Sequence, residues 1–125
     1  MKTLNIPGGY QQVMPYLIIE NAHAFIEFTK NVFRAEEKHK TMRTEMLIMH
    51  GEISIGNSCI MFADATEQYH VQNAGLFIYM DDCDSVYQKA LANGATNVME
   101  PADQSYGRSA GVKDPFGNTW WITKV

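Results

Sequence analysis

The pattern of apolar positions in the first half of the chain predicts a strand, a helix and three further strands. The run VMPYLIIE, residues 13–20, is typical of a strand. After it, Phe25, Phe28 and Val32 recur at helical spacing. The segments HKTMRTEMLIMHGEISI and CIMFAD follow, and they predict strands joined by a Gly-Asn turn. The first half therefore has the predicted order βαβββ or one close to it.

The second half repeats this order. GLFIYM predicts a strand, SVYQKALANGA a helix, and TNVMEP, GRSAGVKD and NTWWITKV three more strands. Asn21 and Asp82 are candidate N-caps of the two helices, and Gly94 has the position of a glycine that ends a helix. The Gly-Asn turns at 56–57 and 117–118 are 61 residues apart. We interpret the sequence as an internal repeat.

The repeat predicts one α+β domain over residues 1–125, made of two βαβββ half-modules at about 10–66 and 74–125. A polar linker, QYHVQN, separates the two half-modules. Each sheet has an apolar face that must be buried, and pairing of the modules would bury it under the helices. The opposite faces would then form a concavity, which is where a ligand site is expected.

Composition and charge exclude several classes of partner. The net charge is −4 and the ten basic residues are scattered, which argues against nucleic acid and anionic membranes as partners. No apolar run approaches the roughly 20 residues of a membrane span, and the first residues lack the apolar stretch of a signal peptide. We therefore expect a cytoplasmic protein. Cys59 and Cys83 are too few for a disulfide framework and are expected to be free thiols.

Four segments, which together cover nearly the whole chain, are similar to segments of a known family. They are PYLIIENAHAFIEFTKNVF, MHGEISIGNSCIMFAD, YMDDCDSVYQKALANGAT and QSYGRSAGVKDPFGNTWWIT. They resemble the vicinal oxygen chelate superfamily, the group of glyoxalases, bleomycin-resistance proteins and extradiol dioxygenases. The last segment is most similar to the subgroup labelled demethylubiquinone-methyltransferase-like. The resemblance implies a glyoxalase-like fold, in which the two modules curve a mixed sheet around a cup. It also implies a homodimer, with modules paired within or between chains.

The metal-dependent enzymes of this family hold a divalent ion with four ligands, typically His, Glu, His and Glu. An ion with open coordination positions stabilises negative charge that develops on substrate oxygens. The resemblance places the four ligand positions at Met14 or Pro15, Ile60 or Met61, Gly75 or Leu76, and Trp121. All of these residues are apolar, and isolated methionines suit only soft ions such as Cu(I). We therefore expect no metal and no cofactor.

The same resemblance, continued by strand alternation, assigns side chains to the two sheet faces. Those expected to face the cup and bind a ligand are Met14, Tyr16, Met61, Phe77, Tyr79 and Trp121. Those expected to face the helices are Leu17, Ile19, Leu76, Ile78, Trp120 and Ile122. Methionine and aromatic walls suit an apolar or planar organic ligand. In the alternative interpretation, these side chains pack against one another and fill the cup.

Two polar groups are candidates for chemistry. His50 and Glu52 are two residues apart on one strand and should share a face, where an imidazole beside a carboxylate can act as a general base. Alternatively, they form a surface pair. Tyr106 and Arg108 flank a glycine, and they are expected at the rim of the cup, where Arg108 would hold an anionic group. Alternatively, this segment is a turn with Arg108 in solvent.

Three functions remain open from the sequence. The first is a metal-independent protein of the bleomycin-resistance type that binds a small apolar or aromatic molecule. The second is a lyase or another enzyme of the superfamily that acts without the ancestral metal or with a relocated one at His50 and Glu52. The third is a structural or interaction module with a filled cup. Fold analogy does not decide between them.

Overall fold

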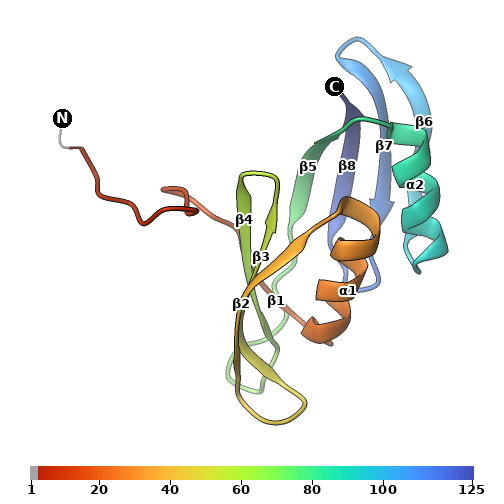
Figure 1. Ribbon diagram of the computed structural model, residues 1–125. Helices are drawn as coiled ribbons and strands as arrows, with labels where there is room; N and C mark the ends of the chain where they lie inside the picture. The colour runs from red at the N-terminus through yellow and green to blue at the C-terminus, as the bar shows by residue number, and fades with distance from the viewer. Residues whose placement is uncertain (1–2) are drawn as a thin grey trace.

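The computed structural model describes residues 3–125 and contains two βαβββ units (Figure 1). The first unit consists of β1 (Tyr16–Ile19), α1 (Ala22–Phe33), β2 (Glu36–Met42), β3 (Ile48–Ile55) and β4 (Ser58–Asp64). The second consists of β5 (Gly75–Met80), α2 (Cys83–Ala92), β6 (Thr96–Gln104), β7 (Gly107–Lys113) and β8 (Thr119–Lys124). The predicted α+β class and the repeated element order are confirmed.

Each unit forms its own four-stranded mixed sheet, which we call sheet A for the first unit and sheet B for the second. The strand orders are β1-β4-β3-β2 and β5-β8-β7-β6. In both sheets the first strand pairs in parallel with the last, and the remaining pairs are antiparallel. Within residues 3–125, no strand of sheet A is hydrogen-bonded to a strand of sheet B. The arrangement is therefore open rather than a closed barrel.

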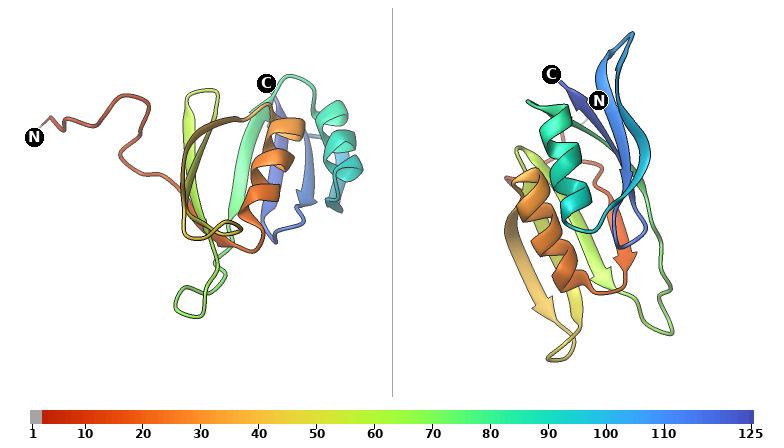
Figure 2. Two further views of the ribbon diagram at one scale, coloured as in Figure 1. Left: turned by 60° about the horizontal axis from the view of Figure 1, so that its bottom comes forward. Right: turned by 90° about the vertical axis from the view of Figure 1, so that its right-hand side faces the viewer.

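The two helices cover one face of each sheet, and the core lies between them and the sheets. Figures 1 and 2 show α1 beside sheet A and α2 beside β6 and β7. Leu17 and Ile19 are buried on this face of sheet A, as are Trp120 and Ile122 on that of sheet B. Trp120 lies against Phe33 of α1, with 4.4 Å between the ring centres. The predicted core side of the alternation is confirmed at these positions.

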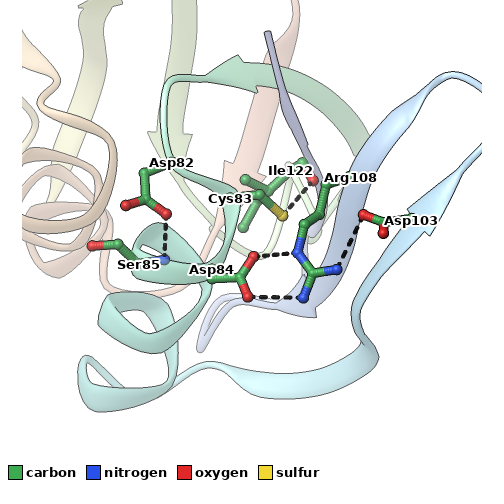
Figure 3. A network of polar contacts seen from close by, with 7 residues as sticks. All are labelled: Asp82, Cys83, Asp84, Ser85, Asp103, Arg108 and Ile122. Atoms are coloured by element: carbon green, nitrogen blue, oxygen red, sulfur yellow. Dashed lines mark hydrogen bonds and ion pairs between the residues drawn. The ribbon is translucent and has the colours of Figure 1, made fainter.

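The two helix N-termini are capped in different ways. Asp82 accepts a hydrogen bond from the Ser85 amide at 3.1 Å, as predicted for this N-cap (Figure 3). Asn21 occupies the N-cap position of α1, as predicted, but its backbone is left-handed (φ 61°) and its side chain makes no capping hydrogen bond. Instead, the buried carboxylate of Asp64 accepts from the amides of Ala22 at 2.9 Å and Ile48 at 2.7 Å. The end of β4 thereby fixes the start of α1.

A second buried carboxylate, Asp114, organises the turn between β7 and β8. It accepts hydrogen bonds from the amides of Phe116 and Asn118, both at 2.9 Å, and from the Asn118 side chain at 3.1 Å. It also accepts from the indole nitrogen of Trp120 at 2.8 Å. Asn118 in turn accepts from the Ala74 amide at 3.1 Å, so the turn holds the linker that leads into β5. These hydrogen bonds explain why the segment DPFGN forms the turn between β7 and β8.

Neither helix within residues 3–125 is long and apolar enough to cross a membrane. Both are helices of a small α+β domain, with 12 residues in α1 and 10 in α2. Their buried side chains face the sheets and each other. The helices therefore serve as covers of the core.

Replacing Asp114 with alanine is expected to lower the free energy of unfolding by at least about 3 kcal/mol. The change leaves a buried indole N–H and two backbone amides without their acceptor, and unsatisfied buried donors cost about 1–3 kcal/mol each. Urea denaturation followed by circular dichroism measures the effect. The control is Asp103→Ala, whose carboxylate is exposed and should matter much less. Equal losses in the two variants would contradict this account of the turn.

Candidate functional site

Three aromatic side chains project from the face of sheet B that no helix covers. Phe77 and Trp121 are partners in the parallel register of β5 and β8, and Tyr79 is the next residue of β5 on this face. Their exposed fractions are 54% for Phe77, 63% for Tyr79 and 37% for Trp121. The rings of Phe77 and Tyr79 meet edge to face, with 5.1 Å between their centres. We call these three residues the aromatic surface.

A glycine on the neighbouring strand sets the position of Trp121. Gly111 of β7 is the register partner of Trp121, and a Cβ atom at Gly111 would lie 2.7 Å from the indole ring. That distance is far below van der Waals contact, so only glycine lets the indole lie against β7. Gly111 is not among the site residues predicted from the sequence. A glycine inside a predicted strand is nevertheless a recognised signal of close approach.

A cleft borders the aromatic surface. It has a volume of about 690 Å³ and lies between β5 and the turn that joins β3 to β4. Phe77 and Tyr79 line one side of it, and Val13, Ile55 and Cys59 contribute to the other. The volume is in the range of small-molecule sites. Two of the three aromatic side chains therefore have access both to this cleft and to the open face of sheet B.

The uncovered face of sheet A carries a chain of polar contacts instead. The Tyr10 hydroxyl donates to Oε1 of Glu52 at 2.6 Å, and Nε2 of His50 lies 2.7 Å from Oε2 of the same carboxylate. Nδ1 of His50 lies 2.8 Å from the Tyr16 hydroxyl. Four side chains from β1, β3 and the segment before β1 are thus linked. The pairing of His50 with Glu52 agrees with their predicted shared face.

The charge of Glu52 determines the direction of these hydrogen bonds. The side chain of Glu52 is only 6% exposed, and this burial raises the pKa of the carboxyl group. Hydrogen bonds from Tyr10 and His50 outweigh the effect of burial and hold the pKa below its ordinary value. An ionised carboxylate accepts hydrogen bonds and donates none. With a neutral imidazole, Nε2 of His50 must therefore carry the proton, and Nδ1 accepts from Tyr16. Burial, followed by the charge of Glu52, raises the pKa of Tyr16.

Tyr10 is placed by contacts that the sequence does not reveal. The ammonium group of Lys38 lies 3.5 Å from the centre of the Tyr10 ring and donates to the Gly9 carbonyl at 2.6 Å. The neighbouring Gln11 bonds to the backbone of Asn57 at 2.8 Å and of Cys59 at 3.0 Å. The segment before β1 is therefore attached to sheet A at these points, although its first described residues lead away from both sheets (Figure 1).

The structure does not bring Arg108 to the aromatic surface. Arg108 binds Asp84 of α2 through two nitrogens, at 2.7 and 2.9 Å, and Asp103 at 3.2 Å (Figure 3). These bonds raise the pKa of Arg108 and lower that of Asp84. Its side chain lies on the helix side of β7, and Tyr106 is exposed in the turn before this strand. Their ligand roles stay predictions, and an anion at Arg108 would have to compete with two carboxylates.

Comparison with known proteins identifies the family. Residues 10–122 match the Glyoxalase/Bleomycin resistance protein/Dioxygenase superfamily. The chain belongs to this superfamily. An uncharacterized protein of Mycobacterium bovis is 27% identical, with 85% of this chain and 78% of the relative covered.

Solved structures of the glyoxalase superfamily type share the fold at low sequence identity. TioX from a Micromonospora species superimposes with a TM-score of 0.73 at 20% identity, covering 92% of this chain and 96% of TioX. A putative 3-demethylubiquinone-9 3-methyltransferase, the PhnB protein of Bacillus cereus, has a TM-score of 0.72 at 15% identity. The alignment covers 92% of this chain and all of that protein. The neighbours thus include a protein with the subgroup label predicted from the last segment.

The residues that the resemblance places at the four ligand positions of the glyoxalase superfamily do not have the donor atoms that suit its divalent ion. Ile60 is buried in the core, and Leu76 is partly buried against the core. Met61 lies on the uncovered face of sheet A and Trp121 on that of sheet B. None of these side chains offers the oxygen or nitrogen donors that such an ion takes. Across residues 3–125, no three His, Cys, Asp or Glu side chains are grouped as metal ligands.

Neither cysteine is placed to act as a nucleophile. Cys59 and Cys83 are both buried free thiols, as predicted. Burial raises the pKa of each thiol. Because the thiolate is the reactive form, a raised pKa opposes nucleophilic attack. Cys83 instead donates a weak hydrogen bond to the carbonyl of Ile122 at 3.4 Å (Figure 3).

The Glu52 network is expected to make stability depend on pH. A carboxylate whose pKa is lower in the folded state stabilises the protein above its unfolded pKa, about 4.3 for glutamate, and this stabilisation is lost as the pH falls through the folded pKa. The difference in unfolding free energy between wild type and Glu52→Gln should therefore be full at pH 6 and shrink below about pH 4. Urea denaturation from pH 3 to 7 measures it. A difference that grows on acidification would contradict the assignment.

Proposed function

We propose that this glyoxalase-superfamily protein binds a small apolar or aromatic molecule at the aromatic surface, without the ion of the metal-dependent members. The observation that carries the proposal is the exposure of Phe77, Tyr79 and Trp121 on one face, with Gly111 beneath the indole. Large apolar side chains exposed together mark interaction sites more often than isolated ones do. The adjoining cleft of about 690 Å³ adds a concave wall to this surface.

The flat rings favour a planar ligand. Each 100 Å² of apolar surface removed from water contributes about 2.5 kcal/mol, and aromatic pairs add about 0.5–1.5 kcal/mol. A ligand of roughly 20 heavy atoms at about 0.3 kcal/mol per atom would bind with a Kd of tens of micromolar. The family description also names bleomycin resistance proteins, which supports an organic molecule as the ligand.

We further propose a cytoplasmic homodimer in which the open faces of the sheets line a cup that the two copies enclose between them, with room left for the ligand. Sheets A and B are not hydrogen-bonded to each other within the described residues, so a cup of eight strands is not closed by one chain. Apolar side chains of the segment before β1 are exposed as well, including Leu4 at 54% and Val13 at 85%. The unpaired cysteines support the cytoplasmic location, because disulfides are rare there.

Replacing Trp121 with alanine is expected to weaken ligand binding at least tenfold. The change removes the stacking face of the indole and its apolar contact area. The uncharged dye N-phenyl-1-naphthylamine, whose emission rises in apolar sites, serves as the probe in equilibrium titrations. Tyr69→Ala is the control, because Tyr69 is 52% exposed but lies in the linker loop. Equal affinities of the two variants would place the dye elsewhere and overturn the proposed site.

Gly111→Ala provides a second test that leaves all three aromatic residues in the sequence. Its Cβ must displace the indole, so dye affinity should fall at least threefold and unfolding free energy by about 1–3 kcal/mol. Gly75→Ala is the matched control, because nothing lies within 4 Å of its Cβ position. Unchanged affinity in Gly111→Ala would show that the indole orientation is irrelevant to binding.

Light scattering after size-exclusion chromatography tests the homodimer. We expect a mass of twice the 14.1 kDa of the chain at micromolar concentration. Leu4→Glu should shift the equilibrium toward single chains, because burial of an unpaired carboxylate in an interface is costly. A single-chain mass at concentrations where the dye binds would refute the dimer and leave the binding site intact.

A further inference from the structure

The linked polar side chains on the uncovered face of sheet A have the geometry of a three-part site. A base contacts a hydroxyl group, and a carboxylate orients the base. Tyr16, His50 and Glu52 are connected in series at 2.8 and 2.7 Å, both short enough for proton transfer. In many nucleophilic and acid–base sites, a histidine lies within hydrogen-bond reach of a hydroxyl group. A carboxylate holds the histidine and fixes the tautomer of its imidazole. The second carboxylate oxygen of Glu52 is occupied by Tyr10.

We propose that these residues form a proton-transfer site, in which the Tyr16 hydroxyl contacts the substrate and His50 accepts the Tyr16 proton. Tyr16 is the catalytic residue of this site. Glu52 holds His50 with its Nδ1 lone pair toward Tyr16 and stabilises the imidazolium that forms. Tyr10 positions Glu52. Among the protein groups, only Tyr16 and His50 gain or lose a proton, and no metal ion takes part.

The proton balance of the step is complete. The substrate gives a proton to the Tyr16 oxygen while the Tyr16 proton moves to Nδ1 of His50. The products are a substrate anion, a neutral tyrosine and an imidazolium beside the Glu52 carboxylate. Burial and the charge of Glu52 raise the pKa of Tyr16, which opposes a free phenolate, so the transfer to His50 must take place together with the proton transfer from the substrate.

The site is open to a substrate. Tyr16 is 47% exposed and the His50 side chain 28% exposed, whereas Glu52 is buried. The neighbouring register position on β4 is Met61, an apolar contact surface between Tyr16 and Glu52. These features suit an apolar molecule with an acidic proton, either on a phenolic or enolic hydroxyl or on carbon next to a carbonyl. This substrate class rests on the proposed function, while the proton-transfer geometry does not.

Other ionisable groups surround His50. His39 of β2 lies with its ring centre 6.1 Å from that of His50. Arg43, in the loop between β2 and β3, acts on Tyr16 through its positive charge. Tyr16 itself comes from β1, and Tyr10 and Glu52 complete the set. Protonation of His50 removes the acceptor lone pair on Nδ1, so the site should lose activity on acidification.

Benzenesulfonyl fluoride tests the site without a known substrate. In this reaction the Tyr16 oxygen forms a bond to sulfur, fluoride leaves, and the phenol proton passes to His50. Mass spectrometry of digests measures the rate at each tyrosine. At pH 7.5 we expect Tyr16 to react at least tenfold faster than Tyr69, which is more exposed but has no histidine partner. A Tyr16 rate equal to or below that of Tyr69 would overturn the proposal.

Variants separate activation from structure. His50→Gln should lower the Tyr16 rate at least tenfold and abolish the fall in rate caused by acidification, while Tyr69 reacts unchanged. His70→Gln, at an exposed loop histidine, is the matched control and should leave the Tyr16 rate within twofold. Unchanged Tyr16 reactivity in His50→Gln would refute the role of His50. Circular dichroism reports whether each variant is folded.

A measurement on the unmodified protein remains decisive if His50→Gln does not fold. Nitrogen-15 spectra of labelled histidine should show the Nε2–H tautomer of His50 at neutral pH, and the Nδ1–H tautomer would overturn the proposal. The result is independent of dye binding at Trp121. A reactive Tyr16 with no dye binding would refute the proposed function alone, and dye binding with an unreactive Tyr16 would refute the proton-transfer site alone.

Discussion

The structure depends on one constraint: each sheet is covered by helices on one face only. Strand side chains alternate between the two faces, so every second residue is committed to the core and its neighbours are left outside. Trp120 and Trp121 show the consequence, since adjacent indoles have exposed fractions of 1% and 37%. The core indole is fixed by Asp114 and Phe33, and this anchoring fixes the register that presents Trp121 on the other face.

Much of this could be predicted from the sequence because it follows from local pattern. The repeated order of elements, the alternation at the two tryptophans and the shared face of His50 and Glu52 each depend on residues close together in the chain. The structure agrees with all three. Period-two alternation needs no knowledge of distant partners, provided that the strand has been recognised.

The parts that escaped prediction depend on contacts between distant segments. Tyr10 reaches Glu52 across 42 positions of sequence, and Asp64 supplies the side-chain acceptor at the start of α1 across the same separation. Arg108 was expected at a rim because it follows a turn glycine. Its partner Asp84 is 24 residues away on α2, and no local signal indicates that pairing. Such contacts are set by how the helices dock on the sheets.

Duplication explains why the two uncovered faces can differ so much in chemistry. The two units need the same core face to fold, but nothing in the core constrains the opposite face. Sheet A carries an ionised carboxylate held by two hydrogen bonds, whereas sheet B carries three aromatic rings. If a carboxylate lay beside the exposed rings, an apolar ligand that covered the rings would remove water from the carboxylate, which costs free energy. Glu52 lies on the other sheet, where it is already buried and hydrogen-bonded, so the proposed ligand could cover the rings without desolvating this charge.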